Sequence, residues 1–266
     1  IKSFPLSVQN NNLIIEKPSK CFNVNECVYI TARKNYAAFL FGEIPRINKY
    51  INFIKSGMPI ILHGTCLDFH IKFFEFLGIE SKQIIVVPED TLIFALNLYH
   101  STPTFFHHTI SYSAIDYLQK KFKTNFDESF NKNIYLSRSK LGKNSDRFIF
   151  NEKKLETFLK KKGFSILYPE KTSLINQIKI FNSAKIIVSP FGATWVNSMF
   201  RKEKSISLML ATKFSPEFTK IFQYLGNDLS ILTLTPYKVR EANTYSQSYN
   251  FTIDNNAFEI LDQFLN

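Results

Sequence analysis

The sequence contains few cysteines, and none of them lies in a C-x-x-C pair. Among the 266 residues there are three, Cys21, Cys27 and Cys66. An odd and sparse set of this kind does not form a disulfide framework, and it indicates reduced thiols in a cytoplasmic protein. Zinc requires about four close ligands, and the five histidines and three cysteines show no such spacing. We therefore expect neither a disulfide scaffold nor a metal site.

Long apolar runs are missing as well. No stretch approaches the roughly 20 apolar residues of a membrane-spanning helix, and no signal peptide can be recognised. We therefore expect a cytoplasmic protein, either free or associated peripherally with the inner face of the membrane. The chain begins at Ile1 rather than at methionine, so it can be a piece of a longer protein.

Acidic residues are fewer than basic ones, 22 against 33, which gives a net charge of +11 and an isoelectric point near 9.4. Such a charge is typical of proteins that meet nucleic acid, an anionic membrane surface or phosphate-bearing substrates. A solvated lysine-rich surface explains it equally well. The lysines are scattered through predicted helices and form no basic arm, which argues against a nucleic-acid-binding protein. We therefore expect no nucleic-acid partner.

Apolar strands and amphipathic helices alternate along the chain, more regularly in the second half than in the first. An irregular or partly stranded lead-in covers residues 1–27, and Pro45 should break a helix in the first half. The expected strands are residues 28–31, 59–62, 84–87, 92–98, 134–136, 164–167, 185–188, 205–210 and 229–234. The expected helices are residues 36–54, 65–77, 113–122, 152–162, 173–181, 193–200 and 216–225.

This alternation predicts βαβ units on parallel sheets. The apolar, continuous strands agree, because both faces of such sheets are covered. The simplest architecture is α/β, with two Rossmann-like domains facing one another across a cleft. We place the domains at residues 1–115 and 116–266, with the C-terminal helix free to pack back on the first domain.

Open parallel sheets bind ligands beyond the carboxyl ends of their strands. In the second half this rule selects three loops, which contain Arg138 and Ser139, Glu170, and residues 189–194. An arginine can grip a diphosphate through two parallel hydrogen bonds, and a glycine that opens a helix favours an anion. A carboxylate can hold ribose hydroxyls. Together the three loops outline a nucleotide-diphosphate site.

Each of these residues also has an ordinary structural explanation. Arg138 can be a surface salt-bridge partner, and the Pro-Phe-Gly segment at residues 190–192 can be a tight turn. Asn151 can cap the helix that starts at Glu152, and Arg147 is equally ambiguous. The residue types alone therefore leave both explanations open.

The order and spacing of these residues resemble the C-terminal part of glycosyltransferase family 61. Its members include bacterial capsular-polysaccharide enzymes, plant xylan arabinosyl- and xylosyltransferases and animal N-acetylglucosaminyltransferases. The matching positions are Arg138, Arg147, Asn151, Glu152, Pro169, Glu170, Gln177, Ala184, Gly192, Ala193 and Asn197. A second block over residues 35–47 resembles the acceptor-side segment of the family through Asn35, Tyr36, Pro45 and Arg46.

Two histidines of the family pattern are missing. Ala38 stands where the first block of the family has histidine, and Gly42, next to Glu43, stands where an acid is common. Phe191 stands where histidine precedes Gly-Ala in the family. The sequence therefore supports donor binding better than catalysis. A catalytically silent family member that binds a sugar nucleotide or a glycan is the alternative.

The resemblance implies a GT-B fold, with a sugar nucleotide in the second domain and a glycan or lipid-linked glycan acceptor in the first. It implies inverting transfer of a hexose or pentose in capsular or surface polysaccharide synthesis, with no cofactor. The lack of an Asp-x-Asp motif fits transfer without a metal.

Individual residues can now be given roles. The candidates for the general base are Glu43, by its place in the family motif, and His63, at the end of a strand in the first half. His107 and His108, in the crossover segment, rank below them. The acceptor-side residues are Asn35, Tyr36 and Arg46. The donor-binding residues are Arg138, Ser139, Arg147, Asn151, Glu152, Glu170, Pro190, Phe191, Gly192, Ala193, Thr194 and Asn197.

Overall fold

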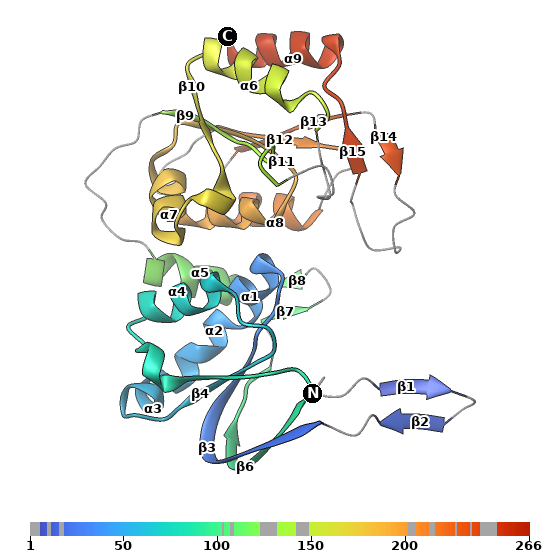
Figure 1. The fold of residues 1–266 in the computed structure, drawn as a ribbon. Helices are drawn as coiled ribbons and strands as arrows, with labels where there is room; N and C mark the ends of the chain where they lie inside the picture. The colour runs from blue at the N-terminus through green and yellow to red at the C-terminus, as the bar shows by residue number, and fades with distance from the viewer. Residues whose placement is uncertain are drawn as a thin grey trace. The chain divides into compact units, whose positions relative to one another are not determined.

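The computed structural model of the chain shows two compact units, Ile1–Lys121 and Phe122–Asn266. Each unit is built on a parallel sheet (Figure 1). The α/β class and the parallel sheets expected from the sequence are thus confirmed. The structure describes residues 6–9, 12–15, 19–102, 104–106, 109–122, 132–141, 149–201, 206–212, 216–226, 228–234, 236–239 and 249–266.

The first unit contains a four-stranded sheet in the order β5-β4-β3-β6, in which all neighbouring strands are parallel. The strands are β3 (Lys20–Thr31), β4 (Ile60–His63), β5 (Ile84–Val87) and β6 (Thr91–Tyr99). Two hairpins accompany it, β1 (Leu6–Gln9) with β2 (Asn12–Ile15) and β7 (Phe105–Phe106) with β8 (Thr109–Ile110). The helices are α1 (Tyr36–Gly42), α2 (Ile44–Ile47), η1 (Asn48–Tyr50), α3 (Ile51–Lys55), α4 (Asp68–Phe76), η2 (Ser81–Gln83) and α5 (Tyr112–Phe122).

The helix expected over residues 36–54 is broken, but the break does not lie at Pro45. Helix α1 ends at Gly42, and Pro45 lies in the first turn of α2. Proline lacks an N–H group, and the first turn of a helix does not use that group for an internal hydrogen bond. Proline therefore starts a helix here, and the break moves back to Glu43.

The second unit contains a five-stranded sheet in the order β10-β9-β11-β12-β13, again with every neighbouring pair parallel. The strands are β9 (Asn133–Leu136), β10 (Phe164–Leu167), β11 (Ile186–Pro190), β12 (Ile206–Ala211) and β13 (Asp228–Thr233), with a hairpin of β14 (Pro236–Val239) and β15 (Tyr249–Phe251). The helices are α6 (Glu152–Lys161), η3 (Pro169–Lys171), α7 (Leu174–Ser183), η4 (Ala193–Phe200), α8 (Pro216–Tyr224) and α9 (Asn255–Leu265). Helices α6 and α9 cover one face of the sheet, and α7 and α8 cover the other (Figure 1).

The direction of the chain across this sheet reverses at β9. From β9 the chain passes through α6 to β10, and from β10 it returns through α7 to β11 on the other side of β9. Right-handed crossovers in opposite directions place their helices on opposite faces of the sheet. Strands β9 and β11 are therefore neighbours whose following segments leave toward opposite faces, which is a topological switch point.

The core of the second unit joins α6, α9 and one face of the sheet. Leu155 and Leu159 of α6 pack in one buried cluster with Ala257 and Leu261 of α9. Lys162 adds an ion pair to Asp262, with 2.5 Å between Nζ and Oδ1. The C-terminal helix packs in the core of its own unit, because its apolar i, i+4 pair, Ala257 and Leu261, faces α6.

The helix expected over residues 193–200 is present, and it is a 3-10 helix, η4. Side-chain hydrogen bonds fix its carbonyl groups and its start. The Ser198 hydroxyl donates to the Trp195 carbonyl at 2.7 Å, and the Trp195 indole N–H donates to the Pro190 carbonyl at 3.0 Å. These side-chain contacts favour the tighter helix, which is usual in short connecting segments.

Two adjacent residues of α9 test this packing. Leu261 is fully buried and Ile260 is 43% exposed, so Leu261→Ala leaves a cavity and Ile260→Ala does not. We expect Leu261→Ala to lower the free energy of unfolding by about 2–4 kcal/mol and Ile260→Ala by less than about 1 kcal/mol. Urea unfolding followed by circular dichroism measures both. Equal losses in the two variants would mean that α9 is not anchored through Leu261.

Candidate active site

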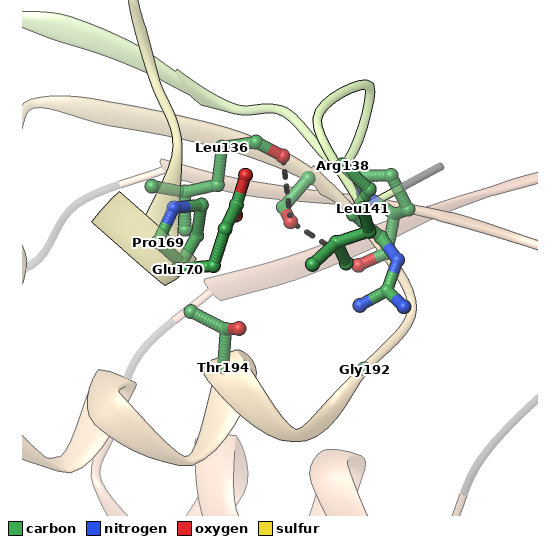
Figure 2. A pocket seen from close by; sticks show the side chains of 9 residues that line it. Leu136, Arg138, Leu141, Pro169, Glu170, Gly192 and Thr194 are labelled. Carbon is green, nitrogen blue, oxygen red and sulfur yellow. Dashed lines mark hydrogen bonds between the residues drawn. The ribbon is translucent and has the colours of Figure 1, made fainter. Parts of the chain in front are cut away.

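A pocket of about 160 Å³ lies at the carboxyl ends of β9, β10 and β11, at the switch point (Figure 2). Sites that enclose a whole small molecule commonly measure about 300–1,000 Å³, so this pocket fits only part of a ligand. Its lining comes from the three loops selected by the strand-end rule. The lining residues are Leu136, Arg138, Leu141, Pro169, Glu170, Ser189, Pro190, Gly192 and Thr194.

The charged and polar side chains lie on different sides of this pocket. Figure 2 shows the guanidinium of Arg138 directed toward the loop at Gly192, with Glu170 and Thr194 on the other side. A cation, a carboxylate and a hydroxyl therefore border one small space. Such a set can hold a phosphate group at one side and sugar hydroxyls at the other.

The loop that bears Arg138 is fixed from below by a buried carboxylate. Glu152 is 2% exposed, and its Oε1 accepts hydrogen bonds from the Arg138 backbone N–H (2.7 Å), the Tyr135 hydroxyl (2.8 Å) and the Ser137 hydroxyl (2.9 Å). Burial raises the pKa of Glu152, while these three donors act in the opposite direction. Glu152 thus lies beneath the loop and orients it, and it does not line the pocket.

A second carboxylate of α6 supports the same loop. Oε1 of Glu156 accepts a hydrogen bond from the hydroxyl of Ser139 (2.8 Å) and lies 2.7 Å from the hydroxyl of Ser137, whose single proton is shared between Glu152 and Glu156. Beside them, the ammonium of Lys140 lies 5.7 Å from the centre of the Tyr168 ring. Ser139, which the sequence assigned to donor binding, therefore faces α6 rather than the pocket.

The loop that bears Glu170 is held by two amide side chains. Nε2 of Gln177 donates to the carbonyls of Pro169 and Thr172, both at 3.0 Å. Oε1 of Gln177 accepts from Nδ2 of Asn197 at 3.1 Å, and Asn197 is fully buried. The structure therefore places Asn197 behind the pocket, where it orients the glutamine that holds the loop.

The third loop connects β11 to η4. The Ser189 hydroxyl donates to the Leu136 carbonyl at 3.3 Å, which joins the ends of β11 and β9. The Phe191 N–H donates to the Leu210 carbonyl at 2.8 Å. Pro190, Gly192 and Thr194 line the pocket, whereas Phe191 and Ala193 are half-buried beside it.

Asn151, another residue assigned to the donor, does not line this pocket. Asn151 precedes α6, but its side chain makes no capping hydrogen bond to that helix. Instead it forms a reciprocal pair with the backbone of Ile253, with distances of 2.7 and 2.9 Å. Arg147 lies outside the described residues, as do His107 and His108.

A network of buried charges lies near the carboxyl ends of the strands in the first unit. Glu43 is fully buried, and its carboxylate pairs with Arg33 (2.7 Å) and Arg46 (2.5 Å). Nη2 of Arg46 lies 2.6 and 2.8 Å from the two ring nitrogens of His100. Burial and the positive charge of Arg46 lower the pKa of His100, so this ring is neutral and can accept from the guanidinium.

His63 ends β4 beside this network and is also buried. Its Nδ1 lies 2.9 Å from the hydroxyl of Tyr29, whose pKa is raised by burial. Nε2 of His63 has no hydrogen-bond partner among the described residues. The buried ring therefore has one nitrogen that no described residue uses.

The remaining residues of the acceptor-side block have structural contacts. Oδ1 of Asn35 accepts from the Ala38 N–H at 3.0 Å and caps α1, and Tyr36 packs on Phe69 at 5.4 Å between ring centres. Arg46 is 2% exposed, so its contacts are those of the charged network. This part of the block therefore holds α1 and α2 in place.

Sequence reasoning missed Tyr29, His70 and His100. His100 directly follows β6, so the strand-end rule would have selected it if applied to the first half. His70 is recognisable only in the structure, where its Nδ1 accepts from the Leu67 N–H (2.9 Å) and its Nε2 bonds the Arg33 carbonyl (2.9 Å). Burial lowers the pKa of His70, in keeping with a neutral capping ring.

The geometry of the second unit agrees with a comparison against protein families. The family model described as Glycosyltransferase 61 matches residues 19–208, which is more than half of the chain. The chain belongs to glycosyltransferase family 61. This match contains both the charged network of the first unit and the switch-point pocket of the second. No individually curated protein matches the sequence closely enough to count as a relative.

Membership in family 61 supports transferase activity, with a sugar donor and a glycan acceptor as the partners. Within the described ranges, no group of three or more His, Cys, Asp or Glu side chains is placed to hold a metal ion. Among the helices in the same ranges, none has the length and apolar character needed to span a bilayer.

The raised pKa of Glu152 predicts a pH dependence. Its folded pKa lies above the unfolded value near 4.5, so its contribution to stability is complete below that value and is lost as pH rises through the folded pKa. The free energy of unfolding of the wild type minus that of Glu152→Gln should therefore decrease as pH rises above 4.5. Urea titrations of both proteins at several pH values measure this difference in the free energy of unfolding. A difference that does not change with pH would show that burial of this carboxyl group has no energetic consequence.

Proposed function

We propose that this family 61 member transfers a sugar from a nucleotide-diphosphate donor to a glycan, and that the switch-point pocket binds the diphosphate. The observation that carries this proposal is the position of Arg138 in a small pocket at the carboxyl ends of three parallel strands. The volume of about 160 Å³ suits the diphosphate, with the nucleoside and the sugar on either side of it.

The donor contacts follow from the chemistry of the lining. Arg138 presents a planar cation that can bind two phosphate oxygens at once. Gly192 precedes the first turn of η4, where backbone N–H groups are not used inside the helix, and these groups favour an anion. Glu170 and Thr194 can accept and donate hydrogen bonds to sugar hydroxyls. The carboxylates of α6, Glu152 and Glu156, hold the loop that bears Arg138 in the position that these contacts require.

We further propose a GT-B arrangement, in which the two units face one another across a cleft and the acceptor binds to the first unit. The general base in this proposal is His63, because Nε2 is uncommitted when Nδ1–H donates to Tyr29. Glu43 is less suited to the same role, since its carboxylate is held by two arginines. Family members carry other residues at Ala38 and Phe191, so His63 would supply the missing base.

The proposed reaction is an inverting displacement. The acceptor hydroxyl oxygen attacks the anomeric carbon while the bond from that carbon to the diphosphate oxygen breaks. The hydroxyl proton passes to His63 Nε2, and the charge that develops on the diphosphate is stabilised by Arg138. No metal is required, because the guanidinium and the N–H groups of η4 provide the positive potential.

We extend the proposal to the cellular setting. The net charge of +11 supports peripheral association with the anionic inner face of a membrane. Lipid-linked glycans are attached to such a surface, so an acceptor of this kind would be met there. A role in capsular or other surface polysaccharide synthesis follows from that acceptor.

Arg138→Ala tests the donor site. We expect the affinity for a nucleoside diphosphate to fall by about 30-fold or more, since a charged hydrogen-bonding partner is lost. The affinity of Arg138→Lys should lie between those of the wild type and Arg138→Ala, because lysine keeps the positive charge but lacks the planar guanidinium. Isothermal titration calorimetry with uridine and cytidine diphosphates measures all three proteins. Lys153→Ala, an exposed change on α6, is the matched control. Unchanged affinity in Arg138→Ala would show that the site lies elsewhere.

His63→Gln tests the general base. Turnover should fall by about 100-fold or more while donor affinity stays constant, because the base acts only in the chemical step. Tyr29→Phe should cause a smaller loss, since it removes only the hydroxyl beside Nδ1. Donor hydrolysis and transfer to a glycan panel provide the rates, and thermal shift provides the affinities. Wild-type turnover by His63→Gln would exclude this histidine.

The same assays test the alternative of a catalytically silent family member. Ala38 and Phe191 replace two histidines of the family pattern, which favours that alternative. A silent member would be stabilised by one sugar nucleotide and would neither hydrolyse nor transfer its sugar. Donor turnover above background, lost in Arg138→Ala, would exclude it.

A further inference from the structure

A second hollow of about 480 Å³ lies in the second unit, between α7 and the edge of the sheet formed by β9 and β10. It is larger than the switch-point pocket and shares no lining residue with it. We call it the basic hollow, because three of its nine lining residues are lysines. The lining residues are Lys132, Ile134, Ser165, Leu167, Lys171, Thr172, Asn176, Lys179 and Ile180.

The pleat of the sheet explains the floor of the basic hollow. Ser165 pairs with Ile134 across β10 and β9, and Leu167 lies two residues further along β10. Side chains of paired residues, and of residues two apart, point to the same face of a sheet. Ile134 and Leu167 therefore form an apolar floor on the α7 side, and Ser165 adds a hydroxyl.

The rim of the basic hollow is positively charged. Lys132 and Lys171 are exposed, and Lys179 is half-buried. The backbone N–H of Lys185 donates to the Lys132 carbonyl at 3.2 Å, which brings a fourth lysine close to the rim. None of the nine lining residues is acidic. A concave site with charges of one sign concentrates ions of the opposite sign.

We propose that the basic hollow binds a compact phosphate-bearing molecule, in addition to the nucleotide diphosphate proposed for the switch-point pocket. Lys132 and Lys171 provide point charges for the phosphate. Ser165, Thr172 and Asn176 provide neutral hydrogen-bonding groups, and the apolar floor contacts the body of the ligand. Inorganic pyrophosphate and a sugar phosphate carry the same recognition chemistry, so both are probes for this site. The proposal does not depend on glycosyltransfer.

One structural element lies next to both binding sites. Pro169 and Glu170 of the turn η3 line the switch-point pocket, whereas Lys171 and Thr172 line the basic hollow. Gln177 bonds the carbonyls of Pro169 and Thr172 and so ties the two ends of this turn together. A phosphate bound to Lys171 would therefore act on the turn that carries Glu170, and occupancy of one site should change affinity at the other.

Methyl NMR on the full chain separates the two sites. Ile134 and Ile180 line only the basic hollow, and Leu136 and Leu141 line only the switch-point pocket. We expect pyrophosphate to shift the Ile134 and Ile180 signals in the wild type and in Arg138→Ala alike. Glucose 1-phosphate should shift the same signals. A higher affinity for glucose 1-phosphate than for pyrophosphate would indicate a sugar-phosphate site, and a lower one a site for the phosphate alone.

Neutralising two lysines of the rim should weaken this response. Lys132→Gln with Lys171→Gln should weaken pyrophosphate binding at the Ile134 and Ile180 signals by about tenfold or more. The matched control is Lys153→Gln with Lys161→Gln on α6, which removes the same charge at exposed positions and should leave these signals unaffected. Asn176→Asp, an isosteric change at an exposed position, adds a negative charge to the rim and should weaken binding as well.

Three outcomes would overturn the proposal. The first is the absence of pyrophosphate shifts at Ile134 and Ile180. The second is an equal loss in the control pair, which would indicate general charge attraction rather than a site. The third is lysine-dependent retention on phosphatidylglycerol vesicles without any pyrophosphate shift, which would make the hollow part of a membrane-binding surface. Loss of nucleotide binding in Arg138→Ala concerns only the proposed donor site.

Discussion

The reversal of strand order at β9 is the constraint on which most of the second unit depends. The segments that follow β9 and β11 leave toward opposite faces of the sheet. This separation leaves a crevice at the carboxyl ends of the two strands. The same reversal leaves β10 at the edge of the sheet, where α7 covers β9 and β10 incompletely. The switch-point pocket and the basic hollow therefore both follow from this reversal of strand order, the first at the ends of the strands and the second on their face.

Buried charge organises the two units in different ways. In the first unit, Glu43 is compensated by two arginines, so that a carboxylate can exist without water. In the second, Glu152 has neutral donors and a backbone N–H around one oxygen, and its other oxygen has no partner among the described residues. The first arrangement holds helices in place, and the second holds the loop that bears Arg138. Several polar residues of the family motif, such as Arg46 and Glu152, are thus buried, and they hold the helices and loops in place.

Sequence reasoning reached the α/β class, the parallel sheets and most strand positions, because local apolar patterns determine them. It also selected Arg138, Glu170, Gly192 and Thr194, which line one pocket, since strand ends can be located from the same patterns. The roles of other residues depend on distant partners. Asn197 could not be separated from a ligand contact without knowing that Gln177 lies beside it, and the contact of His100 with Arg46 joins residues 54 positions apart in the sequence. The tight winding of η4 depends on side-chain hydrogen bonds that periodicity does not reveal. How the two units face each other stays a prediction.

The reciprocal pair between Asn151 and Ile253 reaches across about a hundred residues of the chain. It joins the start of α6, which supports the Arg138 loop, to the segment that leads into α9. The region that defines the family ends at residue 208, before β13 and before α9. The part of the chain that carries the recognisable chemistry is thus not a complete folding unit. Its Arg138 loop depends, through α6, on a C-terminal segment outside the family match, so sequence variation in that segment can change the position of this loop without altering any residue that lines the pocket.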